Sequence, residues 1–207
     1  MSEPIERYTP EERVNHWFTA IAFVLLTLSG LALFHPSLFW LSHLLGGGTW
    51  TRILHPFIGV AMFVSFVGLA WSFWEHNRIT RLDRQWLARW RDVVGNREEN
   101  LPEVGRYNAG QKLLFWVMVG TMLVLLVTGI AIWHPYFAPA APVALLRSAV
   151  LIHSVCSFLL ILGIIIHIYA AIWVKGSMRA MTRGQVSRAW AKKHHRAWYR
   201  DVGGGAR

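Results

Sequence analysis

The sequence is poor in cysteine and in charged residues, and both shortages limit what the chain can do. Cys156 is the only cysteine among 207 residues, so the chain has no disulfide, no CxxCH haem attachment and no cysteine set for an iron–sulfur cluster. Only 15% of the residues are charged, whereas a soluble domain carries about 25%. The chain therefore has no soluble domain of useful size.

Long apolar runs make up much of the chain, at residues 17–34, 56–74, 113–133 and 149–174. Each run is close to the roughly 20 residues that a membrane helix needs. The first run lacks a small-residue cleavage site and is followed by three more, so it is not a cleavable signal peptide. We expect an all-α membrane protein, a four-transmembrane-helix bundle that forms a single integral membrane domain over residues 1–207. Its expected parts are helices at about 15–35, 53–75, 110–134 and 143–175 and a basic tail at 176–207.

The net charge of +10 is placed on one side of these helices. Of the 21 lysines and arginines, only Arg52 and Arg147 lie in the loops that follow the first and third helices. This positive-inside pattern predicts that the N- and C-termini are both cytoplasmic. The basic segments then face anionic lipid and partner subunits, with no nucleic acid implied. Apolar residues at helical spacing predict short interfacial helices in the inner loop and in the tail.

The sequence contains an internal repeat. Residues 28–36, LSGLALFHP, match residues 127–135, VTGIAIWHP, at an offset of 99. At an offset of 98, His55 falls on His153. We expect the first and second pairs of helices to be parallel repeats about an axis along the membrane normal.

Four histidines, His16, His55, His153 and His167, lie in or at the ends of the expected helices. An ionisable side chain inside a membrane is a functional candidate by default. His153 and His167 are fourteen residues apart on one stripe, which is roughly 21 Å along a helix. The alternative for this stripe is two polar residues that are hydrogen-bonded inside the bundle. The other six histidines are expected to be solvated or interfacial: His35, His43, His76, His134, His194 and His195.

Helix direction sorts the four histidines into two pairs of equal depth, His55 with His153 on the outer side and His16 with His167 on the inner side. Zinc prefers four clustered ligands, whereas haem iron takes axial imidazoles on its two faces. The pairs therefore predict two b-type haems, each with two histidine ligands. Irons with both axial positions filled have no open site, which favours electron transfer.

The repeat makes the inner site asymmetric, because His167 corresponds to Leu69 and His16 corresponds to Phe115. The outer pair, in contrast, is made of repeat mates.

Two arginines lie one helical turn before predicted ligands, Arg13 before His16 and Arg52 before His55. Each is a possible partner for a haem propionate, or simply part of the flanking positive charge.

The segment before the third helix is a candidate quinone site. A quinone carbonyl needs hydrogen-bond donors at the membrane edge, and Asn108, the Gly110 backbone N–H and Gln111 could supply them. The alternative is a helix cap, because asparagine is a good N-cap residue.

The chain resembles the membrane b-type cytochrome, or gamma, subunit of respiratory formate dehydrogenases over nearly its whole length. The segments that carry the resemblance are RILHPFIG around His55, VGRYNAGQK before the third helix, VLLVTGIAIW within it, and IHIYAAIWVKGSMRAMTRGQVSRAWAKKHHRAWYR. Diheme subunits of nickel–iron hydrogenases and thiosulfate-type reductases share the four-helix plan. YNAGQK and WAKKHH favour the formate dehydrogenase branch.

The resemblance implies two haem b groups, with iron ligands that map onto His55 and His153 and onto His16 and His167. It implies a menaquinone or ubiquinone site lined by Asn108, Gly110, Gln111 and His167. It also implies a place in the bacterial inner membrane, as a multi-pass subunit in a higher oligomer of heterotrimers. The implied partners are an iron–sulfur (beta) subunit with one membrane helix and a molybdenum or tungsten catalytic (alpha) subunit, both on the outer face.

The expected function is to pass electrons from the periplasmic-side iron–sulfur subunit through two haems to a quinone reduced near the cytoplasmic face. The chain would be the electron-transfer and quinone-reducing subunit of a formate:quinone oxidoreductase. It has no formate-oxidising site of its own, because it has no cluster, molybdenum or nucleotide motif. The alternatives are a cytochrome b subunit of a nickel–iron hydrogenase or thiosulfate-type reductase, and a haem-free membrane anchor.

Overall fold

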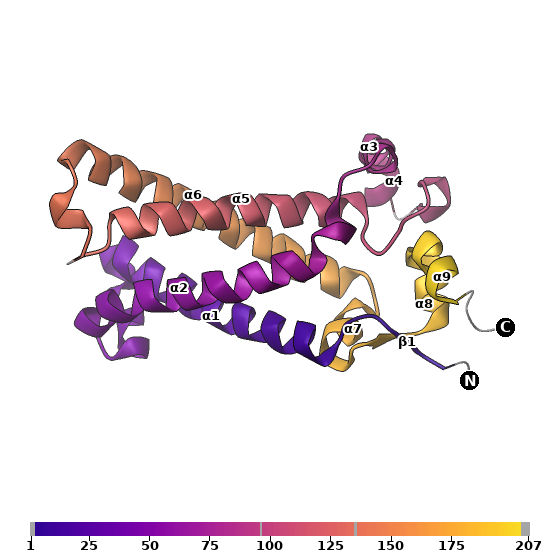
Figure 1. The fold of residues 1–207 in the computed structure, drawn as a ribbon, viewed down its shortest axis with the longest axis horizontal. Coiled ribbons are helices and arrows are strands. Elements are labelled where there is room, and N and C mark those ends of the chain that lie inside the picture. Colours follow the sequence, from indigo (N-terminus) through magenta and orange to yellow (C-terminus); the bar gives the residue numbers. More distant parts are fainter. Residues whose placement is uncertain (1–2, 96, 135, 204–207) are drawn as a thin grey trace. The chain divides into compact units, whose positions relative to one another are not determined.

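A computed structural model describes residues 3–95, 97–134 and 136–203. Within these ranges, α1, α2, α5 and α6 are long and apolar enough to cross a membrane (Figure 1). This confirms the all-α membrane fold. The elements in chain order are β1 (Ile5–Glu6), α1 (Pro10–Phe34), η1 (Pro36–Leu45), α2 (Gly48–Phe73), η2 (Glu75–Asn77), α3 (Arg81–Ala88), α4 (Trp90–Val94), η3 (Glu98–Asn100), α5 (Ala109–Ala131), η4 (Ala138–Ala140), α6 (Val143–Trp173), α7 (Ser177–Arg183), β2 (Gln185–Val186), α8 (Arg188–His194) and α9 (Arg196–Gly203).

The first membrane helix, α1, begins at Pro10, earlier than the expected start near residue 15. A capping box fixes this N-terminal end of the helix: Glu12 N donates to Thr9 Oγ1 at 3.3 Å, and Thr9 N donates to Glu12 Oε2 at 2.9 Å. Proline is favoured at the first helical position because the missing N–H has no partner to lose there. The hydrophobic run therefore marks only the apolar part of a longer helix.

The described residues form two compact units. We call residues 14–69, 117–134 and 136–166 the bundle unit, and residues 3–13, 70–95, 97–116 and 167–203 the cap unit. The bundle unit holds most of the four membrane-length helices. The cap unit holds the N-terminal segment, the inner loop and the tail.

The core of the bundle unit takes one buried residue from each long helix: Ala22, Met62, Met122 and Leu160. Figure 1 shows these helices side by side. Most of their other apolar side chains are exposed, as expected of a surface that lipid covers. The bundle is thus joined by a narrow apolar centre and presents its apolar outside to the membrane.

A polar contact joins α1 to α2 inside the bundle unit. Asn15 Nδ2 donates to Ser65 O at 3.1 Å, the Ser65 hydroxyl donates to Asn15 Oδ1, and the Thr19 and Ser65 hydroxyls are 2.8 Å apart. Gly68 leaves room for this contact, because a Cβ there would be 3.0 Å from Asn15 Nδ2. Small and polar residues of this kind hold membrane helices together.

In the cap unit, the N-terminal segment pairs with the tail. β1 and β2 are antiparallel, with Ile5 opposite Val186. Beyond the strands, Arg7 N and Tyr8 N both donate to Gly184 O, at 2.7 and 3.2 Å. Gly184 has φ +79°, and a Cβ there would be 2.9 Å from Tyr8 O, so the turn requires glycine. This sheet could not be predicted from the sequence, because strands of two residues have no measurable periodicity.

Short helices occur in both segments where they were expected, α3 and α4 in the inner loop and α7 to α9 in the tail. Their contact with a membrane stays a prediction. The tail helices pack on the N-terminal segment around buried Ala180, Val186, Ala191 and Trp198.

Candidate functional site

The outer histidine pair lies in the bundle unit, with His55 on α2 and His153 on α6. Each ring contacts a hydroxyl on the preceding long helix. His55 Nδ1 is 2.7 Å from Ser29 Oγ of α1, and His153 Nδ1 is 2.9 Å from Thr128 Oγ1 of α5. Ser29 and Thr128 are repeat mates at an offset of 99. The internal repeat in the sequence thus corresponds to a repeated contact.

The carbonyl partners of the two hydroxyls decide the direction of these bonds. Ser29 Oγ donates to Leu25 O at 2.7 Å, and Thr128 Oγ1 donates to Val124 O at 2.7 Å. Because a hydroxyl has one proton, each must accept from the Nδ1–H of its histidine. Each Nε2 then keeps its lone pair, which is the electron pair that binds a metal.

Glycines border both rings. A Cβ on Gly30 would be 3.5 Å from His55 Cε1, and one on Gly129 would be 3.3 Å from His153 Cε1. The rings therefore lie directly against the neighbouring helix backbone. Two imidazoles on different helices, each with a free Nε2, are the donor set that a bis-histidine haem requires.

The predicted inner ligands are both half-buried but belong to different units. His16 lies in the bundle unit, with its ring edge-on to Trp17 at 5.5 Å. His167 lies on α6 in the cap unit. Their pairing stays a prediction.

The two candidate propionate partners differ in their surroundings. Arg13 Nη1 donates to Thr182 O of α7 at 2.9 Å, so part of its guanidinium already binds the tail. Arg52 is exposed near the start of α2. A role for either in binding haem stays a prediction.

Asn108 and Gln111 form a capping box at the start of α5. Asn108 N donates to Gln111 Oε1, and Gln111 N donates to Asn108 Oδ1, both at 2.9 Å. The cap that the sequence offered as an alternative is therefore present. It uses only the amide oxygens, so the two NH2 groups, which are the donors a quinone needs, take no part in it. Gly110 lies against Trp86, because a Cβ there would be 3.4 Å from the Trp86 ring.

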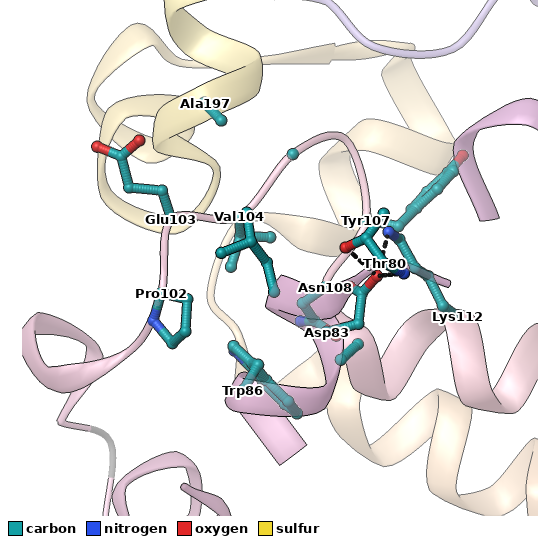
Figure 2. Close-up of a pocket in the computed structure, with 13 residues that line it drawn as sticks. Thr80, Asp83, Trp86, Pro102, Glu103, Val104, Tyr107, Asn108, Lys112 and Ala197 are labelled. Carbon is teal, nitrogen blue, oxygen red and sulfur yellow. Dashed lines mark hydrogen bonds and ion pairs between the residues drawn. The ribbon is translucent and has the colours of Figure 1, made fainter. Parts of the chain in front are cut away.

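A pocket of about 210 Å³ adjoins Asn108 in the cap unit. It lies between α3, residues 102–109, the first turn of α5 and Ala197 of α9. Figure 2 shows apolar Trp86, Pro102 and Val104 on one side and the polar groups Thr80, Asp83 and Lys112 on the other. We call it the Asn108 pocket.

A buried ion pair closes the polar side of this pocket. Asp83 Oδ2 accepts from Lys112 Nζ at 2.8 Å and from Thr80 N and Oγ1 at 2.7 and 2.8 Å. Burial acts to raise the pKa of Asp83, but the hydrogen bonds from Lys112 and Thr80 outweigh it and hold the pKa below its usual value. Asp83 therefore stays a carboxylate, and Lys112 is fixed at the pocket edge.

Arg7 holds the segment that leads into Asn108. Only 4% of Arg7 is exposed. Its guanidinium lies 4.6 Å from the Trp198 ring, 5.2 Å from the Trp190 ring and 5.8 Å from the Tyr107 ring. Nη2 of Arg7 donates to Arg106 O at 2.5 Å. A single buried cation thus joins the N-terminal segment, the tail and the approach to α5.

His195 holds the same segment from the tail. Its Nδ1 donates to Gly105 O at 2.8 Å, and its Nε2 is 3.4 Å from Arg7 Nη2. Burial and the nearby Arg7 charge lower the pKa of His195 to about 3, so the ring is neutral. His195 was expected to be solvated or interfacial; the tail folds back and leaves only 3% of it exposed, so a solvated His195 is wrong.

Sequence reasoning missed Ser29, Thr128 and Arg7. The signal for the hydroxyls was the small-hydroxyl–glycine pair that occurs in both copies of the repeat, Ser29-Gly30 and Thr128-Gly129. Arg7 had no signal, because its environment is made by residues far away in the sequence.

Known proteins similar to this chain include membrane cytochromes. It is 48% identical over 200 residues to the formate dehydrogenase cytochrome b556(fdo) subunit of Escherichia coli strain K12, covering 97% of this chain and 94% of the relative. It is 45% identical over 191 residues to the nitrate-inducible formate dehydrogenase cytochrome b556(Fdn) subunit of the same strain, covering 92% and 88%. It is 42% identical over 197 residues to the formate dehydrogenase cytochrome b556 subunit of Haemophilus influenzae, covering 95% and 83%.

These relatives confirm the resemblance on which the sequence analysis relied. The profile of the prokaryotic cytochrome b561 family matches residues 7–184, a range that contains all four predicted haem ligands. The chain therefore belongs to the prokaryotic cytochrome b561 family.

Proposed function

We propose that this chain is the membrane diheme cytochrome b subunit of a formate dehydrogenase complex. In this role it carries electrons from an iron–sulfur subunit on the periplasmic side to a quinone that is reduced near the cytoplasmic face. One observation carries the proposal: His55 and His153 are held alike by Ser29 and Thr128, with Nε2 free, in a chain 48% identical to a formate dehydrogenase cytochrome b556 subunit.

His55 and His153 would hold the outer haem b, and His16 and His167 the inner one. Haem iron supplies one-electron transfer by changing between the ferrous and ferric states. The chain's part would be to supply two imidazole ligands to each haem from these four histidines.

The charge distribution orients the chain. Arg52, near the start of α2, is the only lysine or arginine in residues 14–77, and Arg147, near the start of α6, is the only one in residues 113–174. By the positive-inside rule, the cap unit and both termini then lie in the cytoplasm. The outer histidines then face the periplasm, where the iron–sulfur subunit and the molybdenum or tungsten catalytic subunit dock. Residues 1–207 act as one integral membrane domain, within a higher oligomer of heterotrimers.

The Asn108 pocket is the place for the quinone ring. Leu82, Trp86 and Val104 offer an apolar wall for a flat ring, while Asn108 Nδ2 and Lys112 Nζ can donate to its carbonyl oxygens. Reduction of menaquinone or ubiquinone to the quinol takes two electrons and two protons. The protons enter from the cytoplasm, and Asp83 and Lys112 line the pocket as a charged pair.

The quinone proposal is tested by variants that keep the helix cap. Serine and aspartate are both good N-cap residues, so Asn108→Ser and Asn108→Asp preserve the start of α5 but remove the NH2 donor. In the purified complex, both should lower the rate of quinol formation about tenfold or more, a loss of about 1.4 kcal/mol or more from the transition state. The haem spectra should not change.

Asn108→Ala is the matched comparison, because it removes both the cap and the donor. If Asn108→Ser turns over quinone at the full rate, Asn108 is only a cap and the quinone lies elsewhere. The proposed function as a whole fails if the purified chain has no b-type absorption or does not copurify with an iron–sulfur subunit.

A further inference from the structure

We propose that Ser29 and Thr128 are positioning residues for the outer haem: their hydroxyls fix the planes of the His55 and His153 rings and strengthen both as iron ligands. This inference rests on the proposed function, because it assumes that these histidines hold a haem. It assigns a role to two hydroxyls whose other hydrogen bonds, within the part of the chain that the structure describes, go to backbone carbonyls of their own helices.

Each hydroxyl uses its one proton on a carbonyl of its own helix, so toward the histidine it can only accept. Ser29 Oγ donates to Leu25 O at 2.7 Å and lies 3.2 Å from Leu26 O. Thr128 Oγ1 donates to Val124 O at 2.7 Å and lies 3.3 Å from Leu125 O. Because the proton is committed to the helix, the lone pairs face the histidine. A ring held at Nδ1 in this way can turn little about its Cβ–Cγ bond.

The glycines complete the constraint. Gly30 and Gly129 each follow the hydroxyl residue and let Cε1 of the ring lie against the helix backbone. A ring held at Nδ1 and against backbone at Cε1 has a fixed orientation relative to α1 or α5. The two ligands are therefore set in place by their neighbours and not by the iron alone.

The same bonds change the electron donation of the ligands. A hydrogen bond from Nδ1–H makes an imidazole more basic, and a more basic ligand stabilises ferric over ferrous iron. Only 2% of Ser29 and 8% of Thr128 are exposed, so water does not compete for the bond. Both ligands carry this bond, so the two hydroxyls should lower the potential of one haem together.

Serine and threonine share a hydroxyl but differ in shape. The two copies of the repeat use different side chains at the same place and make the same bond to the same ring nitrogen. The hydroxyl is therefore the feature that the site uses. An alanine or a valine of similar volume should fill the space without replacing it.

The test measures the midpoint potential of each haem in the purified complex, with Ser29→Ala, Thr128→Val and the double variant. Each single variant should weaken the ferric preference of one haem about threefold to tenfold, which raises its potential by about 30 to 60 mV. The double variant should show the sum. The potential of the other haem should not move, and electron paramagnetic resonance should show changed g values for the shifted haem alone.

Matched controls separate this role from packing. Thr121→Val removes a hydroxyl of α5 that donates only to Val117 O, at 2.7 Å, and should shift neither haem. Ser29→Thr and Thr128→Ser keep the hydroxyl and should restore the parent potential. If Ser29→Ala instead loses one haem while Ser29→Thr and Thr121→Val keep both, the positioning role is also supported.

The inference is overturned if both single variants keep two haems with unchanged potentials and g values. That result would leave the proposed function intact. A parent complex with no b-type absorption would instead remove the proposed function itself, so the two failures are distinguishable.

Discussion

The bundle unit and the cap unit use polar side chains in opposite ways. In the bundle unit the contact between a hydroxyl and a histidine ring occurs twice, once in each copy of the repeat. The cap unit is dense in cations and aromatic rings, with Arg7 between Tyr107, Trp190 and Trp198 and with Asp83 paired to Lys112. Symmetric, nearly dry sites suit electron carriers, whereas proton-coupled quinone chemistry needs donors, charge and access to water.

The two copies of the repeat match at His55 and His153 but differ at His167. His55 and His153 are repeat mates with equivalent hydroxyl partners. At the position that corresponds to His167, the first copy has Leu69, which is buried. The inner end of the first pair of helices is instead joined by Asn15 and Ser65. The two halves thus share a histidine at the positions of His55 and His153 but not at that of His167.

The largest expected effect is a loss of stability in the cap unit alone, caused by removing the Arg7 side chain. Arg7→Ala removes a buried cation from four aromatic rings and leaves Arg106 O without the Arg7 donor. We expect the cap unit to lose about 3 kcal/mol of stability, measured as faster hydrogen exchange at residues 103–107 and 188–202. The outer haem absorption should not change. Arg179→Ala, at an exposed position of α7, is the control and should have no effect. Loss of the outer haem in Arg7→Ala would show that the units are not independent.

The second effect is a pH dependence confined to the cap unit. The pKa of His195 is about 3 in the folded chain and about 6.5 when unfolded. Between these values the unfolded chain binds a proton that the folded chain does not. The contribution to stability is therefore complete above pH 6.5 and falls by about 1.4 kcal/mol for each unit of acidification below it.

Hydrogen exchange in the cap unit at pH 7 and pH 5 measures this dependence. Arg7 and His194 are the charged and titratable groups that act on His195, and burial of His76 beside Arg106 lowers its pKa in the same direction. His195→Gln should flatten the profile. If His195→Gln shows the same dependence of hydrogen exchange on pH as the parent, another group causes the pH sensitivity.

A smaller effect is expected inside the bundle unit. Ser65→Ala removes the hydroxyl between Asn15 and Thr19 and should cost about 1 kcal/mol, the range measured for hydrogen bonds between membrane helices. Thermal unfolding of the purified chain measures this loss. Ser154→Ala, whose hydroxyl donates to Val150 O of its own helix at 2.9 Å, is the matched control. A change in cap exchange in Ser65→Ala would contradict the separation of the units.

The sequence predicted what depends on local pattern. Run length and hydropathy found the four long helices, and the repeat brought His55 and His153 to equivalent positions. It failed where distant segments meet. Nothing near His195 indicates that Gly105 and Arg7 bury it, and nothing near Ile5 indicates that Val186 is its strand partner. At Asn108 the sequence left a helix cap and a quinone donor as alternatives. The structure has the cap, which uses the amide oxygen of Asn108 and not its NH2 group.

The central claim, a haem held by His55 and His153, is tested most directly by haem content. In the purified chain, reduced-minus-oxidised spectra and extracted haem should give two haem b groups for the parent. His55→Ala should retain one, with the inner haem spectrum unchanged. His43→Ala, at an exposed position of η1, should retain two. Two haems in His55→Ala would contradict the claim.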